Sequence, residues 1–192
     1  MMGRFGLSQP VPRSEDRRFL TGTGRYTADI DLPGQAHAVV VRSQHAHAQI
    51  RSIDAAEASA MPGVLAVAAA PDLARDGLGD IPCAVPVKGP GGQPAPSPGR
   101  PLLARDRVRF VGEPVAMVVA ETLVQARDAA ESVLVDYAPL PAVAAVEDAA
   151  DDDAPVQIWD GASGNVAFFW ERGDEARVEA ELRRAAQLVR LR

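Results

Sequence analysis

Short apolar runs separated by turn residues dominate the pattern of this chain. The runs at 36–42, 64–70 and 114–120 are mainly apolar and too short for buried helices, which is typical of strands covered on both faces. Residues 46–53 alternate apolar and polar side chains and predict a strand with one solvated face. Residues 133–137 alternate in the same way and predict a further strand.

Capping residues mark where helices are expected to begin. Asp54 and Glu57 have the spacing of a capping box before a short helix that ends at the Pro-Gly pair 62–63. Thr122 and Gln125 have the same spacing before a longer helix. One face of that longer helix is apolar at i, i+3, i+4 and i+7. The residues of this face are Ala126, Ala129, Ala130 and Val133.

A last helix is predicted after a cap at Asp174. Glu179 and Arg183 are spaced for an i,i+4 ion pair on this helix. Its apolar stripe consists of Val178, Leu182, Ala185 and Val189. No Gly or Pro stops the pattern before Arg192, so the chain is expected to continue into a following region.

Residues 64–76 and 115–128 repeat one pattern. Each has an apolar strand, a capping residue and a helix start that ends in Arg-Asp. Two copies predict a duplicated strand–helix unit rather than a solenoid. The fold class expected is therefore α+β, with a mixed sheet, flanking helices and a long loop rich in Pro and Gly.

Three regions are expected along the chain. Residues 1–34 form an extended N-terminal arm, and 35–146 form the folded domain, with 71–101 as an exposed loop dense in Pro and Gly. Residues 147–192 form a linker and the start of the next region; their acidic run, 147–153, is predicted to be a surface turn or linker. Both tryptophans and a Phe-Phe pair fall within 158–170, and this segment is expected to dock on an apolar surface. The 71–101 loop is expected to contact a partner or to be disordered.

The charge and composition exclude several classes of function. The net charge of −6 repels nucleic-acid phosphates, and no apolar run is long enough to span a bilayer. The start of the chain lacks the apolar stretch of a signal peptide, and the single cysteine, Cys83, cannot form an internal disulfide. A cytoplasmic protein without nucleic-acid or membrane partners is expected.

Candidate chemistry is sparse. His45 and His47 are expected on one face of a strand, yet only His37 could join them, and no acidic residue completes a metal site. Glu113 lies in a tight turn as a lone carboxylate, for which a structural or subunit-contact role is favoured over acid–base catalysis. The glycine pairs do not have the context of a phosphate loop. No catalytic, cofactor-binding or metal-binding residue is therefore assigned.

Eight segments together resemble the N-terminal part of the large, molybdenum-carrying subunit of the xanthine dehydrogenase, aldehyde oxidase and aerobic carbon monoxide dehydrogenase family. They occur in the family's order and cover nearly the whole chain. They are residues 13–16, 18–22, 24–30, 32–34, 42–48, 62–64, 111–116 and 135–141. The resemblance implies an α/β-hammerhead domain. The final run, 187–192, resembles the stretch just before the family's molybdenum-binding portion.

The resemblance also implies what surrounds such a domain. The family oxidises its substrates with a molybdopterin, in bacteria commonly the cytosine dinucleotide form, and passes electrons through iron–sulfur clusters to FAD. No residue of this chain matches the family's cofactor loops or catalytic glutamate, so this chain alone is expected to bind no cofactor. Its expected partners are the remainder of the molybdenum-binding subunit and the iron–sulfur subunit.

Three functions follow from these observations. The first is a part of a molybdenum hydroxylase that is not catalytic by itself and braces the molybdenum domain against the iron–sulfur subunit. The alternative is a stand-alone, non-catalytic interaction module that binds a partner through 71–101 or 158–170. The third is a small metal-binding protein that uses His37, His45 and His47.

Overall fold

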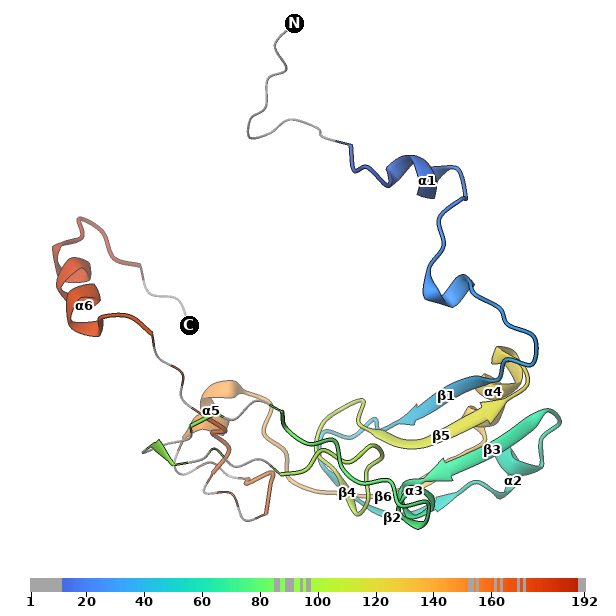
Figure 1. Ribbon diagram of the computed structural model, residues 1–192. Helices are drawn as coiled ribbons and strands as arrows, with labels where there is room; N and C mark the ends of the chain where they lie inside the picture. The colour runs from blue at the N-terminus through green and yellow to red at the C-terminus, as the bar shows by residue number, and fades with distance from the viewer. Residues whose placement is uncertain are drawn as a thin grey trace, which may run out of the picture.

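The computed structural model describes residues 12–84, 87–88, 92–93, 95, 98–151, 154, 156–160, 162, 164–168, 170 and 172–189. Its named strands form two three-stranded sheets, ordered β1-β5-β3 and β4-β2-β6 (Figure 1). The strands are β1 (His37–Arg42), β2 (Ala48–Asp54), β3 (Val64–Ala69), β4 (Arg107–Val108), β5 (Pro114–Ala120) and β6 (Leu134–Pro139).

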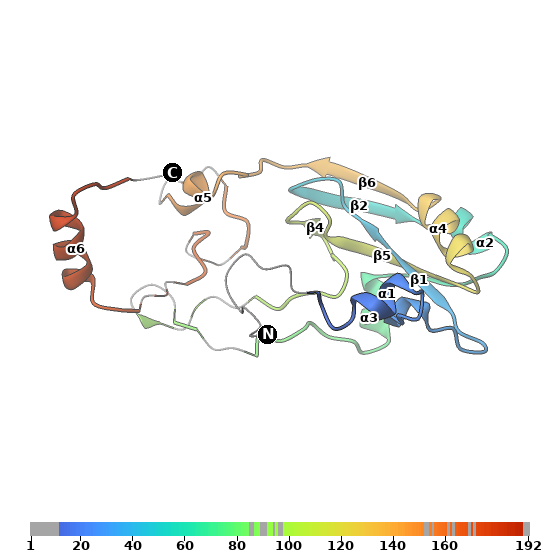
Figure 2. The ribbon, with the colours of Figure 1, turned by 90° about the horizontal axis from the view of Figure 1, so that it is seen from above.

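The helices differ in how they relate to the sheets. They are α1 (Asp16–Leu20), the 3-10 helix η1 (Thr27–Asp29), α2 (Ala56–Ala60), α3 (Ala70–Arg75), α4 (Leu123–Glu131), α5 (Val146–Ala150) and α6 (Glu175–Arg184). Helices α2 and α4 lie at one end of the sheets, whereas α5 and α6 lie beyond the opposite end (Figures 1 and 2). No helix in the described part of the chain is long and apolar enough to cross a membrane.

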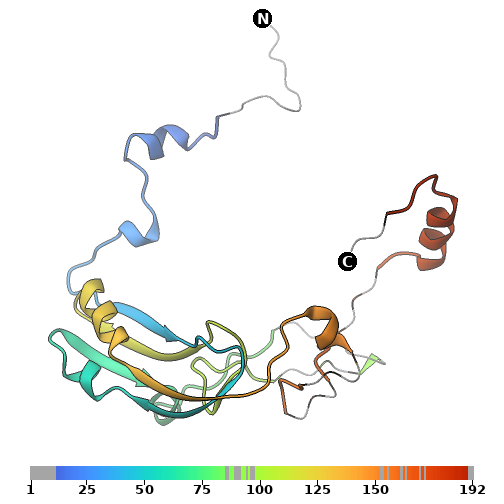
Figure 3. The ribbon, with the colours of Figure 1, turned by 180° about the vertical axis from the view of Figure 1, so that it is seen from behind.

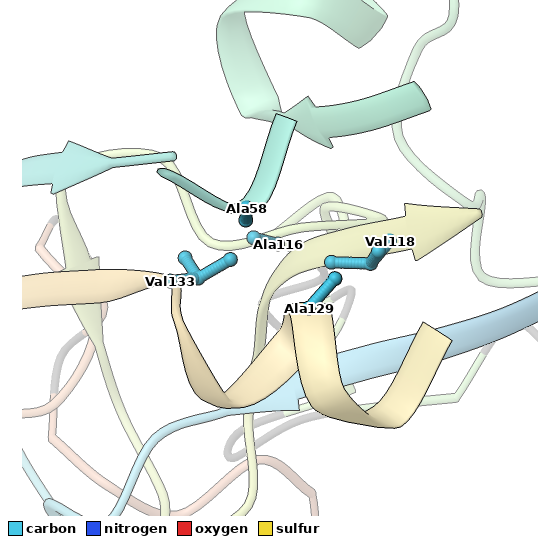
Figure 4. Close-up of a cluster of buried hydrophobic side chains, with 5 residues drawn as sticks. All are labelled: Ala58, Ala116, Val118, Ala129 and Val133. Carbon is cyan, nitrogen blue, oxygen red and sulfur yellow. The ribbon is translucent and has the colours of Figure 1, made fainter. Parts of the chain in front are cut away.

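The main core lies where α2 and α4 meet β5. Its fully buried members are small: Ala58 from α2, Ala116 and Val118 from β5, and Ala129 from α4, with Val133 at the entry to β6 (Figure 4). Alanines let the backbones of helix and strand approach closely, so the contact is made with few large side chains. This core explains how a chain with only 5% aromatic residues packs.

A second cluster joins the two sheets. It consists of Ala48 from β2, Val108 from β4, Val115 from β5 and the loop residue Ala104, all at most 1% exposed. Ala104 donates its N–H to the carbonyl of Pro114 over 2.8 Å, which fixes the loop to the start of β5. Strand β5 therefore contributes to both clusters and is the centre of the body.

The α+β class and both strand–helix units are confirmed, but the expected single mixed sheet is corrected. All pairings between the named strands are antiparallel, and they are divided between two sheets. The physical reason is a bend at residues 43–47, which carries β2 out of the sheet of β1 and leaves β1 beside β5. Single-strand periodicity carries no information about which strands become neighbours.

The predicted helix at Thr122 is confirmed in its cap and its buried face. The hydroxyl of Thr122 accepts the N–H of Gln125 over 3.2 Å and donates to the Oε1 of the same residue over 2.7 Å. Ala126 and Ala129 are fully buried, as the helical spacing predicts. Strand β5 also begins and ends at the predicted residues.

Three local expectations are corrected. The 71–101 segment begins with the last residues of α3, because Pro71 is tolerated in a first turn and Asp72 accepts the N–H of Ala69 over 2.9 Å. That hydrogen bond is the main cause that lowers the pKa of Asp72.

The N-cap of α2 is Ala55, and Asp54 accepts the N–H of Ala56, so the predicted capping box does not form. The acidic run includes the short helix α5, since acidic side chains favour a helix N-terminus.

The two flanking segments lie away from the sheets (Figures 1 and 3). In the described part of the N-terminal arm, α1 and η1 bury no residue. Helix α6 also buries none; its cap at Asp174 is confirmed by a 2.9 Å bond from the N–H of Arg177. The helix ends at Arg184, before the predicted stripe does, and its ion pair joins Arg184 to Glu181 rather than Arg183 to Glu179.

Candidate interaction site

A tight turn precedes β5 and carries Glu113, the carboxylate that the sequence analysis weighed for acid–base catalysis. Glu113 donates its N–H to the carbonyl of Phe110 over 3.2 Å, which closes the turn. Gly112 has φ +88°, a conformation that side-chain-bearing residues adopt only with strain. The turn is attached to the end of β1, because the N–H of Gly112 donates to Ser43 and the N–H of Ser43 donates to Glu113. Phe110 and Val111 are therefore held exposed at its tip.

The side chain of Glu113 points into the protein. It is 5% exposed, and its carboxylate accepts the backbone N–H of Arg109. A carboxylate held in this way fixes the backbone before the turn and is poorly placed to exchange protons with a ligand. The geometry thus supports the structural role that the sequence favours for Glu113.

The bend between β1 and β2 contains two further buried polar residues, Ser43 and His47. Ser43 and His47 are 3% and 5% exposed, and Nδ1 of His47 lies 2.7 Å from the carbonyl of Pro141. The ring of His45 packs 4.8 Å from the ring of Tyr137. Burial raises the pKa of Tyr137 above its ordinary value of 10.0; a hydrogen bond with Ser43 acts in the opposite direction, and the charge of Glu113 adds to the increase.

The histidines do not form the metal site that the sequence left open. His45 and His47 lie in the bend rather than on a strand, so the expectation that one strand face would carry both is wrong. His47 binds a backbone carbonyl, and His45 contacts an aromatic ring. Within the described ranges, no group of three His, Cys, Asp or Glu side chains could hold a metal ion. Cys83 is exposed.

A groove of ≈ 350 Å³ lies beside the Glu113 turn. We call it the Arg109 groove and define it by Ile81, Arg100, Leu102, Arg109, Phe110 and Trp159. Its walls come from the base of the 71–101 segment, the residues before β5, and the aromatic segment that follows α5. The structure therefore brings together the two segments that the sequence flagged as candidate partner contacts.

Arg109 and Trp159 both line this groove and contact each other. The guanidinium carbon of Arg109 lies 4.1 Å from the centre of the Trp159 ring, in a cation–π geometry. The Nη1 group of Arg109 donates to the carbonyl of Arg107 over 3.4 Å, whereas its Nε is buried with no partner among the described residues. Trp159 thus contacts a cation, whereas Phe168 and Trp170 are 48% and 75% exposed and Phe169 lies outside the described residues. The predicted docking of this segment on an apolar surface stays a prediction.

The base of the Pro- and Gly-rich segment is closed beside the groove. Ile81 and Arg100 form an isolated antiparallel bridge, and Asp80 forms an ion pair with Arg105. A Cβ on Gly99 would clash with the carboxylate of Asp80, so only glycine fits there without a shift. The sequence analysis did not predict the groove, because its lining residues are far apart in the chain. The close approach of Gly99 to the Asp80 side chain also has no signal in the sequence around either residue.

The family model for the "Aldehyde oxidase and xanthine dehydrogenase, a/b hammerhead domain" matches residues 21–141. The carbon monoxide dehydrogenase large chain of Afipia carboxidovorans is 39% identical over 94% of this chain and 22% of its own length. The nicotine 6-hydroxylase large subunit of Paenarthrobacter nicotinovorans is 46% identical over 66% of this chain and 15% of its own length. The chain thus spans about a fifth of these relatives or less.

Solved structures agree with the sequence relatives. Quinoline 2-oxidoreductase from Pseudomonas putida 86 matches 82% of this chain and 19% of its own, with a TM-score of 0.66 and 41% identity. The Cu,Mo-CO dehydrogenase matches 95% of this chain and 23% of its own, with a TM-score of 0.63 and 36% identity. By family model, sequence and fold, the chain belongs to the a/b-hammerhead domain family of the aldehyde oxidases and xanthine dehydrogenases.

Proposed function

We propose that this chain is the hammerhead portion of the large subunit of a molybdenum hydroxylase and is not catalytic by itself. In this role it braces the molybdenum-binding portion against an iron–sulfur subunit and so keeps the electron path at a fixed distance. The single observation that carries the proposal is the contrast between a packed body and two flanking segments with exposed apolar side chains. These include Leu20 at 87%, Leu32 at 65% and Val178 at 56% exposure.

The division of the chain supports this role. We propose that residues 1–34 act as an arm, 35–146 as the hammerhead domain, and 147–192 as a linker into the molybdenum-binding region. The packed clusters fall within the middle unit, whereas the described helices of the arm and α6 bury no residue. An apolar side chain left in water has a favourable free energy of burial still to be gained, so such segments are suited to contact other parts of an assembly.

The residues present do not fit the redox groups of the family. An iron–sulfur cluster needs several cysteine ligands, and the chain has one cysteine. The described side chains include no metal-binding set, and Gly22 and Gly24 do not begin an α-helix that could receive the phosphates of a dinucleotide. We therefore propose that molybdopterin, the clusters and FAD are held by other parts of the complex, and we assign no chemical step to this chain.

The test is assembly. A large chain of a carbon monoxide dehydrogenase relative, with its matching hammerhead region deleted, is mixed with this chain and with the iron–sulfur subunit. Co-elution on a sizing column and recovered substrate-dependent dye reduction are expected. The variant Val178→Asp should abolish co-elution if α6 carries the contact. Leu134→Asp, at an exposed side chain of strand β6, is the matched control and should leave assembly unchanged. Absence of any complex would contradict the proposal.

A stand-alone interaction module remains a second candidate because the Arg109 groove joins the two segments predicted to bind a partner. In that case the chain would bind a partner through the groove and would not associate with the deleted large chain. The same sizing experiment separates the two functions.

A further inference from the structure

We infer that the Arg109 groove is a docking surface for an extended, acidic polypeptide segment that carries a bulky apolar side chain. The inference rests on the proposed function only for the identity of the protein that supplies this segment. The groove itself is defined by contacts within the chain, so it can be tested without any assembly.

The lining has the residue types that dominate binding energy at protein interfaces. Trp, Tyr and Arg are enriched among the residues that contribute most of the binding free energy at interfaces. Trp159 is held under Arg109, and Phe110 is presented by the hydrogen-bonded turn that Glu113 closes. Ile81, Leu102 and Phe110 are 48%, 39% and 48% exposed, so an apolar side chain entering the groove would remove them from water.

The charges of the groove select an anionic partner. Four arginines lie in or next to it, and two are already neutralised, because Arg105 pairs with Asp80 and Arg107 pairs with Asp160. Arg100 and Arg109 form no ion pair with any acidic residue in the described part of the chain. Among the described lining residues, the groove therefore has two guanidinium groups and the carboxylate of Glu113, so a partner with carboxylates would complement its charge.

The remaining hydrogen-bonding capacity also favours a carboxylate. The side chain of Arg100 is exposed and forms no ion pair with a described acidic residue, and its guanidinium offers a planar pair of donors that matches the two oxygens of a carboxylate. Glu113 also lines the groove, but its carboxylate is turned toward the N–H of Arg109. The groove therefore still lacks an anion from outside.

The apolar lining distinguishes an acidic polypeptide from other anions. A small inorganic anion would leave Ile81, Leu102 and Phe110 in water. A nucleic acid would be repelled by the negative charge of the whole chain, and the two free arginines give few phosphate contacts. A segment with carboxylates spaced around one large apolar residue satisfies both the guanidinium groups and the apolar walls.

The experiment uses the whole chain with Trp170→Phe, which leaves Trp159 as the only tryptophan and as a reporter inside the groove. The probe is a blocked peptide of sequence Asp-Leu-Asp-Phe, and the control peptide is Asn-Leu-Asn-Phe. Titrations are followed by Trp159 fluorescence and by calorimetry. The acidic peptide should bind about tenfold more tightly than the amide peptide, and its affinity should fall as salt is added.

Two variants locate the binding. Arg100→Gln changes an exposed side chain and should weaken the acidic peptide about fivefold, with Arg109→Gln weakening it further. Arg51→Gln, on strand β2 and outside the groove, is the matched control and should bind as the parent chain does. Circular dichroism of each variant verifies that the body is folded. Because the side chain of Arg100 is exposed, its variant decides the question if Arg109→Gln fails to fold.

Several results would overturn the inference. They are equal binding of the two peptides, no binding at millimolar peptide, unchanged affinity of Arg100→Gln, or tighter binding of a short single-stranded DNA than of the acidic peptide. Peptide binding without assembly would instead contradict the proposed function alone. Assembly without peptide binding would contradict this inference alone.

Discussion

Helices α4 and α6 begin in the same way and end in different environments. They have 9 and 10 residues, and each begins at a side-chain cap, Thr122 for α4 and Asp174 for α6. Helix α4 buries Ala126 and Ala129 against β5, whereas α6 buries no residue. A cap satisfies the free N–H groups at a helix start, but a helix of this length is marginal in water without packing. The comparison separates local helix formation from the stability that burial provides.

The largest expected effect comes from placing a charge on each helix. Ala129→Asp buries a carboxylate without a partner and should lower the free energy of unfolding by more than about 3 kcal/mol. Val178→Asp changes a side chain that is 56% exposed and should shift it by less than about 0.5 kcal/mol. Urea unfolding followed by circular dichroism measures both. Equal losses would show that α6 is part of the cooperative body.

A glycine pair extends the comparison from helices to turns. Gly112 and Gly34 have φ of +88° and +74°, and a Cβ at either would meet no atom within 4 Å. Gly112→Ala should cost about 1 kcal/mol of global stability, since the turn is hydrogen-bonded to β1 and strain is not relieved by fraying. Gly34→Ala lies in the arm and should leave the thermal midpoint unchanged. A lower midpoint for Gly34→Ala would show that the arm unfolds together with the body.

The caps provide a smaller, more local contrast. Thr122→Ala removes the acceptor for the N–H of Gln125 and should lower the unfolding free energy by about 1 kcal/mol. Asp174→Ala removes the matching acceptor in α6 and should reduce helix content without changing the cooperative transition. Hydrogen exchange of the amides in each helix distinguishes the two outcomes.

The smallest effect is expected from the titration of Tyr137 in the body. Its folded-state pKa lies above 10.0 because of burial, so the folded protein holds this proton more tightly than the unfolded chain. The resulting stability is complete below the unfolded pKa and is lost as the pH rises through the folded pKa. With Tyr26→Phe, Tyr137 is the only tyrosine, and ultraviolet difference absorbance follows its ionisation. A midpoint at or below 10.0 would contradict the burial that the structure shows.

Local signals correctly predicted much of the body. The apolar run of β5, the cap at Thr122 and the alanine face of α4 depend on residues close together in sequence, and the structure confirms each of them. The predicted N-cap of α2 was wrong, because the strand before the helix extends to the residue that has the capping pattern. Asp54 has the spacing of an N-cap, yet the chain at that point still belongs to β2, and Ala55 takes the cap position.

The candidate site was much less predictable. A structural or subunit-contact role was predicted for Glu113 and stays a prediction, and nothing in the local sequence shows that its carboxylate would accept the N–H of Arg109. His45 and His47 were expected on a strand because alternation does not reveal the bend at 43–47. The Arg109 groove joins residues from 81 to 159, and no spacing pattern covers that separation.

The sequence by itself determined the short strands, the capped helices and the membership in a hammerhead family, because periodicity, caps and characteristic segments are all encoded locally. Only the tertiary structure decided that the strands divide into two antiparallel sheets and that α4 packs while α6 does not. It also decided that Arg105 and Arg107 form ion pairs with carboxylates, whereas Arg109 contacts the ring of Trp159. Strand order, burial and charge pairing depend on contacts between distant residues, whose free energies are set when the chain closes on itself.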